Sequence, residues 1–349
     1  MESQNNFPYQ HLKFWKIGKE SVNSGFPKAF SVLSFNILAD QLADFDHFPY
    51  CPSKYLEFSY RMNLIKEILM KVNADIICLQ EVDNFSDKKA KIGNEFNEFI
   101  LENYEVIYQP KSQAKTTDGI LIGVKKGLFS IEKCYTVDLN SRFKEDYVVS
   151  GQETFYKGHM AIIVHIFSET LKEKLIIINT HLFHDPRNED VKYFQLSEIV
   201  KEIEMNYNEK DKIIFCGDLN SLPDSNVINL FLNKKDIDIE KNDWHKEYQI
   251  ENMKKIKGLI EKNERKITFK NSYELLPLKR KEENLGYTNY KDIFQGDLDY
   301  IFYNPSSGLL LLEIMKLPNE EFYKLETALP NQYHGSDHLP IVAKFQFVD

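Results

Sequence analysis

The sequence of 349 residues predicts an α/β fold, and two observations carry this prediction. Short apolar runs such as residues 176–178 and 213–215 do not alternate with polar residues, which is typical of strands covered on both faces of a sheet. Between these runs lie segments with an apolar residue at every third or fourth position, which is typical of amphipathic helices. Because strands and helices interleave to the end of the chain without a repeat, we expect one α/β domain.

Strands are expected where a short apolar run ends at polar or turn residues. We predict them over residues 30–37, 76–82, 119–124, 160–167, 175–182, 212–219, 298–303, 309–314 and 341–348.

Three helices are expected between these strands, each recognised by one apolar stripe. Asn188 is the predicted N-cap of the second helix, and the third is expected to start at Asp224 or Ser225. The stripes consist of Phe58, Met62, Ile65, Leu69 and Val72 in the first helix, of Tyr193, Leu196, Val200 and Ile203 in the second, and of Val227, Leu230 and Phe231 in the third.

We expect residues 26–349 to form a single domain, with residues 1–25 as a short irregular lead-in. Residues 236–270 differ from the rest of the chain, because Lys, Glu and Asn crowd around the isolated Trp244. The prediction for this segment is a charged, solvated surface insertion with one helix.

The charge balance restricts the partners of the protein. The chain carries 53 Asp+Glu and 44 Lys+Arg, which gives a formal net charge of −9. This balance argues against a protein that coats nucleic acid by bulk charge, although a local basic patch stays open.

No targeting or membrane signal is visible in the sequence. Residues 1–6 are polar and lead into no apolar segment, and no run of about 20 apolar residues exists, so neither a secretory signal nor a membrane span is expected. The four cysteines are scattered and are expected to be reduced core residues, which indicates a reducing compartment. Without a secretory signal we expect a cytoplasmic protein, with the nucleus or an organelle as open alternatives. They are Cys51, Cys78, Cys134 and Cys216.

Polar residues follow the apolar runs at the points where the predicted strands end or begin. Sites in α/β proteins gather at strand ends, because loops converge there over a rigid support. Asp218 and Asn220 are two positions apart, so in an extended segment both would project to the same side. The full set is Asn36, Glu81, His181, Asp218, Asn220, Asp299, Asp337 and His338.

Each of these residues alone has an ordinary structural explanation. A carboxylate at a strand end is more often a helix cap or a surface residue. Asn36 alone fits a turn residue, and His181 alone fits a buried histidine whose ring nitrogens are hydrogen-bonded. Together they favour a metal site, because Asp, Glu and Asn oxygens suit Mg²⁺ or Mn²⁺ better than Zn²⁺. Such an ion beside a histidine is what phosphoester hydrolysis needs.

Six motifs that contain these residues resemble those of the endonuclease/exonuclease/phosphatase family. They occur in the family's order and extend from about Phe30 to the C-terminus. The resemblance implies a four-layer α/β/β/α sandwich of two mixed sheets with outer helices. The motifs are residues 34–38 (Ser-Phe-Asn-Ile-Leu), 79–82 (Leu-Gln-Glu-Val), 179–182 (Asn-Thr-His-Leu), 217–221 (Gly-Asp-Leu-Asn-Ser), 298–302 (Leu-Asp-Tyr-Ile-Phe) and 336–338 (Ser-Asp-His).

The resemblance also implies which residues bind the metal. Glu81 would be the principal ligand of Mg²⁺, or of Mn²⁺ in its place, with Asn36 and Asp337 nearby.

The catalytic roles implied by the resemblance fall on five residues. Asp218 would orient and deprotonate the attacking water, and Asn220 would position the water and the phosphate. His181 would stabilise the charge that develops on the phosphoryl oxygens. Asp299 would hold His338 in one tautomer and leave its other ring nitrogen for the phosphate or the metal.

Within the family, the sequence resembles the branch of the carbon catabolite repressor-type deadenylases, nocturnin and the Angel proteins. Residues 36–39 (Asn-Ile-Leu-Ala) and 51–56 (Cys-Pro-Ser-Lys-Tyr-Leu) are similar to nocturnin, whereas 181–186 (His-Leu-Phe-His-Asp-Pro) and 287–290 (Tyr-Thr-Asn-Tyr) are similar to the deadenylases.

In the deadenylases, the positions that match Pro186, Asn289 and Phe294 form an adenine pocket, and Lys111 could contact a phosphate. The structural alternatives are that Phe294 is a core residue, that Asn289 is a turn residue and that Lys111 belongs to a solvated lysine-rich loop.

The resemblance therefore implies a Mg²⁺-dependent 3′ to 5′ exoribonuclease that prefers poly(A) and releases 5′-AMP, with an RNA 3′ end or an adenine nucleotide as its partner. One alternative is a phosphatase or phosphodiesterase acting on a nucleotide 2′-phosphate, a 2′,3′-cyclic RNA end or a 2′,5′-linked oligoadenylate. Another is an inactive RNA-binding or scaffold module. We expect a monomer that contacts no membrane and docks through no leucine-rich repeat.

Overall fold

The computed structural model describes most of the chain: residues 9, 12–17, 29–83, 85, 94–112, 117–140, 143, 149–151, 155–234, 239, 246–260, 265–323 and 327–348. Much of the predicted lead-in and part of the predicted insertion, including Trp244, lie outside these residues.

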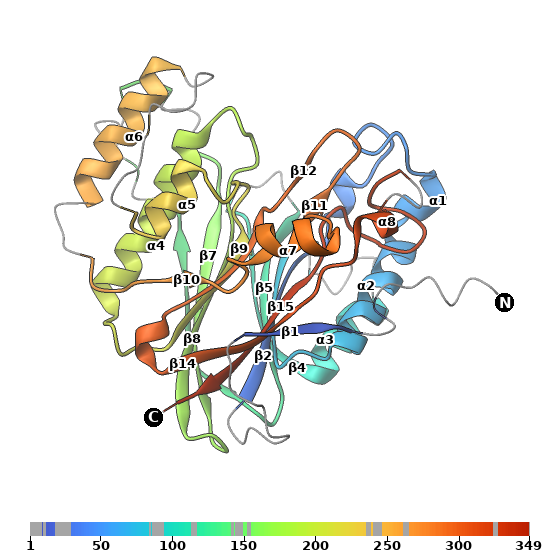
Figure 1. Ribbon diagram of the computed structural model, residues 1–349, viewed down its shortest axis with the longest axis horizontal. Coiled ribbons are helices and arrows are strands. Elements are labelled where there is room, and N and C mark those ends of the chain that lie inside the picture. The colour runs from blue at the N-terminus through green and yellow to red at the C-terminus, as the bar shows by residue number, and fades with distance from the viewer. Residues whose placement is uncertain are drawn as a thin grey trace.

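Two mixed sheets form the centre of the protein (Figure 1). Within them β2 pairs with β3 and β8 with β9 in parallel, and the remaining ladders are antiparallel. The seven-stranded sheet has the order β1 (Phe14–Lys16), β14 (Leu309–Met315), β15 (Ile341–Phe347), β2 (Ala29–Asn36), β3 (Ile76–Asp83), β5 (Asp118–Lys125), β4 (Tyr104–Pro110). The six-stranded sheet has the order β10 (Lys270–Asn271), β13 (Asp299–Tyr303), β9 (Ile213–Asp218), β8 (Glu173–His181), β7 (Met160–Ser168), β6 (Ser130–Asp138).

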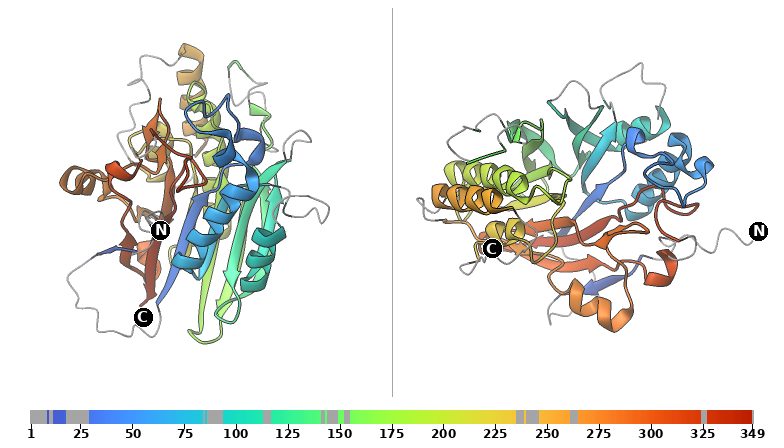
Figure 2. Two further views of the ribbon diagram at one scale, coloured as in Figure 1. Left: turned by 90° about the vertical axis from the view of Figure 1, so that its right-hand side faces the viewer. Right: turned by 90° about the horizontal axis from the view of Figure 1, so that it is seen from above.

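Helices cover the outer faces of both sheets (Figures 1 and 2). On one flank lie α2 (Phe58–Val72) and α3 (Asn94–Asn103), and on the other lie α4 (Glu189–Asn206), α5 (Asn226–Phe231) and α6 (Glu247–Ile260). Shorter elements are η2 (Asp40–Leu42), α1 (Ser53–Leu56), α7 (Leu276–Glu283), the β11 (Asn289–Tyr290) and β12 (Gln295–Gly296) hairpin, η5 (Pro305–Ser307) and α8 (Glu320–Tyr323).

Three apolar layers separate these elements, and the central strands contribute alternate residues to two of them. Ile122, Ile177 and Ile301 belong to the cluster between the two sheets. Leu79 packs with residues of α2 and α3, and Phe215 packs with residues of α4, α5 and α6. The order helix, sheet, sheet, helix confirms the four-layer sandwich.

All nine predicted strands and all three predicted helices are present, with ends that differ by no more than two residues where both ends were predicted. Ser225 is the N-cap of α5, and its side chain accepts a hydrogen bond from the backbone N–H of Ile228. Asn188 precedes α4 as predicted, but its side chain makes no capping hydrogen bond. None of the helices in the described ranges is long and apolar enough to cross a bilayer.

Three predictions are corrected by the structure. The predicted irregular lead-in contains a regular element, because Phe14–Lys16 form β1, which pairs with β14. Cys134 is exposed, because it lies on β6 at the edge of its sheet, whereas the other three cysteines are buried. The segment 236–270 is not only a solvated insertion, because α6 buries Met253 and Ile256. Asn252 on α6 also donates a hydrogen bond of 2.7 Å to Asp190 of α4, so this helix extends the outer layer.

Candidate active site

The alternation of side chains along β9 and β8 directs polar residues into the space between the sheets. On β9, Ile214 and Cys216 face the inter-sheet core, and Asp218 continues the same alternation. On β8, Ile177 faces this core, and His181 lies at an equivalent position four residues later. The parallel register pairs His181 with Asp218 directly.

Two further strands bring polar groups to the same end of this space. Asp299 begins β13 and pairs with Asp218 in the antiparallel register. Asn36 ends β2, one residue after Phe35, which faces the helices on the opposite side. Residues far apart in sequence therefore meet at one rim of the inter-sheet space.

Glu81 reaches this rim through an irregularity in β3. The register with β5 shifts between Gln80 and Val82, and Glu81 has a left-handed φ of 56°. Bulges of this kind turn a side chain out of the strand's regular alternation and are frequent beside active sites. Both carboxylate oxygens of Glu81 are held, one by Asn36 Nδ2 at 3.0 Å and the other by the backbone N–H of Ala39 at 2.9 Å.

Asn36 joins two carboxylates. Its Nδ2 donates to Glu81 and also to Asp218 Oδ2, at 2.9 Å. Its Oδ1 accepts a hydrogen bond from the backbone N–H of Leu38 at 3.0 Å. The predicted metal ligand thus turns its nitrogen, rather than its oxygen, toward the acidic residues.

His181, at the end of β8, and Asn220, just after β9, lie next to each other. Asn220 Nδ2 lies 3.0 Å from His181 Nε2, and the same ring nitrogen lies 3.5 Å from Asp218 Oδ2. The chain is not extended here as expected: Asn220 has a left-handed φ of 47°, and its backbone N–H donates to Asp218 Oδ1. A tight turn therefore makes Asp218 and Asn220 converge on His181.

His338 forms the opposite wall of the cluster. Its Nδ1 lies 2.9 Å from Asp299 Oδ2, and its Nε2 lies 3.6 Å from Asp218 Oδ2. Asp299 thus contacts the ring nitrogen that points away from Asp218, an arrangement that fixes the orientation of the imidazole.

Asp337 lies against the β11–β12 segment. Its Oδ2 accepts a hydrogen bond from Asn289 Nδ2 at 3.2 Å and lies 3.4 Å from Lys291 Nζ. The Asn289 amide proposed for base recognition is thereby partly engaged, although its buried Oδ1 accepts no hydrogen bond from the described residues.

The other predicted substrate contacts lie around this rim. The ring of Phe294 is 40% exposed and approaches Gly296, which also contacts Leu222 in the loop after β9. Pro186 is exposed in the loop between β8 and α4. Lys111 Nζ pairs with the buried Asp118 at 2.7 Å.

Burial and mutual repulsion set the charges of the site. Burial raises the pKa of Asp218 to about 7 and raises the pKa of Glu81, to which Asp337 and Asp118 add repulsion. Burial lowers the pKa of His338, but Asp299 and the neighbouring carboxylates outweigh it and raise the pKa to about 10. Burial keeps His181 neutral by lowering its pKa well below the usual value.

These residues fit a divalent cation. One ligand atom each of Asp218, Asp299 and His338 lie within 4.8 Å of one another, and Asp299 Oδ1 is buried without a hydrogen-bond partner in the described part of the chain. Burial and then repulsion from Asp337 and Asp118 raise the pKa of Glu81, and a bound cation would stabilise its charged form. Oxygen-rich donors of this kind suit Mg²⁺ or Mn²⁺.

Sequence reasoning missed several supporting residues. Lys192 is buried, its pKa is lowered to about 8 by burial, and its Nζ donates to the backbone oxygen of Asn220 at 2.7 Å. Gln80 Nε2 donates to Asn179 Oδ1 at 2.8 Å across the two sheets. Polar residues inside the apolar runs at 76–82 and 175–182 could have signalled this second pair, whereas Lys192 reads as an ordinary helix residue.

The comparison with known protein families agrees with this geometry. The family model described as Endonuclease/Exonuclease/phosphatase family matches residues 33–338. The CCR4-Not complex 3′-5′-exoribonuclease subunit Ccr4 of Kluyveromyces lactis is 27% identical over 93% of this chain and 42% of its own length. The same subunit of Aspergillus niger is 26% identical over 95% of this chain and 54% of its own length, so the chain spans about half of these relatives.

Solved structures share the architecture. ANGEL2, a 2′,3′-cyclic phosphatase in complex with adenosine-2′,3′-vanadate, superimposes with a TM-score of 0.72 at 22% identity, over 96% of this chain and 98% of that chain. The human Nocturnin catalytic domain with bound sulfate superimposes with a TM-score of 0.64 at 18% identity, over 98% of each chain. With six motifs in order, a matching fold and a family match over residues 33–338, the chain belongs to the endonuclease/exonuclease/phosphatase family.

Proposed function

We propose that this protein is a divalent-metal-dependent 3′ to 5′ exoribonuclease that prefers poly(A) and releases 5′-AMP. The observation that carries the proposal is the meeting of Glu81, Asp218 and two histidines at one rim, an arrangement suited to phosphoester hydrolysis. The choice of an RNA 3′ end as substrate is supported by the named activity of the Ccr4 relatives.

The cation is assigned to the Glu81 side of the cluster. Asp218 and Asp299 already have His338 as a positively charged neighbour, whereas burial and then repulsion from Asp337 and Asp118 raise the pKa of Glu81. Mg²⁺ is the proposed ion, because the donors are hard oxygens. When bound, the ion offsets the negative charge of the scissile phosphate and of the leaving oxygen.

The side chains of the protein transfer the proton and position the reacting groups. Asp218 accepts a proton from the attacking water, a role that suits a pKa of about 7. Asn220 and Asn36 hold Asp218 in place through its two carboxylate oxygens. The water oxygen bonds to phosphorus, the bond from phosphorus to the 3′ oxygen of the preceding nucleotide breaks, and that oxygen gains a proton.

Two histidines face the phosphate from opposite sides in this proposal. The neutral His181 donates to a phosphoryl oxygen in the tautomer that carries the proton on Nε2, in place of the contact with Asn220, whereas His338 is charged and donates from its own Nε2. Asp299 is a positioning residue, because it contacts His338 Nδ1 rather than the substrate. Donors aimed at developing charge lower the barrier most when they are fixed in advance.

The test is a substrate panel with Mg²⁺: poly(A), poly(U), RNA that ends in a 2′,3′-cyclic phosphate, and NADP. The proposal predicts progressive shortening of poly(A) with release of 5′-AMP, and no turnover in Asp218→Ala. Asp224→Ala removes an exposed carboxylate from the following loop and should leave the rate unchanged.

Other outcomes would replace the proposal. Phosphate release from NADP, or opening of the cyclic end without shortening of poly(A), would assign the protein to the small phosphoester hydrolases, as the ANGEL2 likeness also allows. No turnover together with no binding of Mg²⁺ or Mn²⁺ in calorimetry would favour an inactive RNA-binding module. The monomeric state and the cytoplasmic location stay predictions from the sequence.

A further inference from the structure

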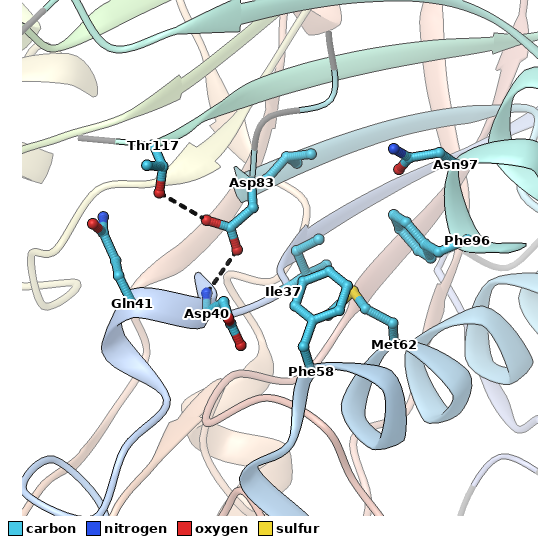
Figure 3. Close-up of a pocket in the computed structure, with 10 residues that line it drawn as sticks. Ile37, Asp40, Gln41, Phe58, Met62, Asp83, Phe96, Asn97 and Thr117 are labelled. Carbon is cyan, nitrogen blue, oxygen red and sulfur yellow. Dashed lines mark hydrogen bonds between the residues drawn. The ribbon is translucent and has the colours of Figure 1, made fainter. Parts of the chain in front are cut away.

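A cavity of about 250 Å³ opens beside the candidate active site, on the outer side of β3 (Figure 3). It lies between η2, the end of β3 and the first residues of α2 and α3. Phe58, Met62 and Phe96 form its apolar side. None of the catalytic or metal-binding residues proposed above lines it.

The opposite side of this cavity is polar and rich in hydrogen-bond acceptors. Asp83 accepts hydrogen bonds from the backbone N–H of Asp40 at 2.6 Å and from Thr117 Oγ1 at 3.2 Å (Figure 3). Asp40 contributes a second carboxylate, which lies 3.4 Å from the buried guanidinium of Arg61. Carboxylate oxygens accept more than one hydrogen bond, so both residues can receive further donors from a ligand.

The cavity is joined to the active site by short structural links. Asp83 follows Glu81 by two residues, which corresponds to about 7 Å along a strand. The backbone N–H of Ala39 holds Glu81, and the next N–H, that of Asp40, holds Asp83. One turn of the chain therefore positions both a proposed metal ligand and the wall of the cavity.

The sheet order places the cavity and the predicted adenine pocket on opposite sides of the scissile position. Asp299 and His338 lie at the β13 and β15 side of the two sheets, next to the hairpin that carries Phe294. The cavity lies at the β3 and β5 side, where Asp83 pairs with Asp118. A strand whose 3′ base lies near Phe294 would extend past Glu81 toward this cavity.

The chemistry of the lining selects the kind of ligand. Two carboxylates repel phosphate and accept N–H donors, while an aromatic and thioether wall favours a flat ring. Adenine and cytosine present an exocyclic amine to such acceptors, whereas uracil presents carbonyl oxygens. The cavity is smaller than a typical drug-sized site, and its size suits one base.

We propose that this cavity binds the base of a nucleotide on the 5′ side of the scissile phosphate and favours a base with an exocyclic amine. The proposal rests on the proposed exoribonuclease function and adds a second base-recognition site to it.

An abasic scan tests this proposal. Penta-adenylates that lack a single base, at each upstream position in turn, are compared with the intact substrate. Because stacking a base on an aromatic side chain is worth on the order of 1 to 3 kcal/mol, we expect kcat/KM to fall by about fivefold or more at one upstream position. Replacing the base at that position by uracil should cost nearly as much as removing it, and cytosine much less.

The matched variants are Asn97→Trp, which fills the cavity from α3, and Glu98→Trp, which adds the same side chain at an exposed position of that helix. Asn97→Trp should lower kcat/KM for intact penta-adenylate by the same factor and show no further loss with the abasic substrate. Glu98→Trp should behave as the unmodified protein, and equal thermal midpoints show that both variants fold.

Binding to the inactive Asp218→Asn protein separates this proposal from the proposed function. Fluorescence anisotropy should show weaker binding of the abasic penta-adenylate than of the intact one, and Asn97→Trp should abolish the difference. If RNA is cleaved but no upstream base affects kcat/KM or binding, the cavity proposal is wrong and the function stands. If the difference in binding is present but the protein cleaves no RNA, the proposed function is wrong and the cavity proposal stands.

Discussion

The amide nitrogen of Asn36 lies 2.9 Å from Asp218 Oδ2 and links the ends of the two sheets across the site. The same nitrogen contacts Glu81 at 3.0 Å, so one neutral side chain separates two buried carboxylates. Glu81 is the proposed metal ligand and Asp218 the proposed general base. The distance between them therefore depends on Asn36, which has neither role in this structure.

Replacing Asn36 by alanine should lower kcat about 100-fold or more while the fold is retained. The change removes two hydrogen bonds to charged groups, each worth roughly 1.5 to 3 kcal/mol, and lets Glu81 and Asp218 move apart. Single-turnover hydrolysis measures the loss. Ser34→Ala on the same strand removes a hydroxyl that accepts a hydrogen bond of 3.3 Å from Gln80 Nε2, and kcat should stay within about twofold. Equal effects of the two substitutions would contradict the positioning role of Asn36.

Replacing Asp299 by asparagine should lower the pKa of His338 from about 10 toward its usual value. The Asp299 carboxylate is the largest favourable influence on the charged imidazole, and its charge is lost in the variant. The pKa is measured by NMR titration of the histidine ring. We expect kcat to fall roughly 10- to 100-fold, which is typical when a supporting carboxylate is removed. Asp297→Asn, at a carboxylate paired with Arg280, should leave the titration of His338 unchanged.

Adding a methyl group at Gly217 should disrupt the pairing of β8 with β9 next to His181 and Asp218. A Cβ there would lie 2.4 Å from the backbone oxygen of Thr180, the residue paired with Gly217 in the ladder next to His181 and Asp218. Gly217→Ala should therefore destabilise the protein and reduce activity by at least about 100-fold. Gly258→Ala on α6 meets no atom within 4 Å and should stabilise the helix by up to about 1 kcal/mol at unchanged activity. Urea unfolding and activity assays on both variants provide the test.

The buried His334 should make stability fall at low pH. Burial lowers its pKa in the folded protein to about 4, against an ordinary value of 6.5, and its Nε2 donates to the backbone oxygen of His338. The unfolded chain then binds more protons between pH 4 and 6.5, so the free energy of unfolding decreases as the pH falls through this window.

His334→Gln keeps a donor but cannot titrate. Between pH 7 and pH 5 the unmodified protein should lose about 2 kcal/mol more stability than this variant, as measured by urea unfolding. The same loss in both proteins would show that His334 does not carry this pH dependence.

Sequence patterns predicted the central strands because their residues are buried on both faces and form apolar runs. The strands β4 and β6 were missed, because they lie at sheet edges and are partly exposed, so polar residues interrupt their runs. Periodicity also could not choose the four-layer sandwich over a doubly wound sheet, since both bury their strands in the same way. The resemblance to the family supplied that choice.

The sequence predicted which residues form the site better than it predicted their conformations. Asn36, His181 and Asp218 could be predicted because they end strands, and the alternation of side chains along a strand determines where they point. The left-handed conformations of Glu81 and Asn220 left no signal in the sequence, because they arise from the register shift in β3 and from the turn after β9. The burial of Lys192 depends on how α4 packs, which no local pattern reveals.

In the proposed mechanism, Glu81 and its neighbours hold a divalent ion against the scissile phosphate. The most direct measurement is a crystal structure with Mn²⁺ and adenosine 5′-phosphate, in which anomalous scattering locates the ion. We expect the ion to be coordinated by a Glu81 carboxylate oxygen and a phosphate oxygen, with the phosphate within hydrogen-bond distance of His181 and His338. An ion that contacts neither Glu81 nor Asp218, or a phosphate bound away from both histidines, would contradict it.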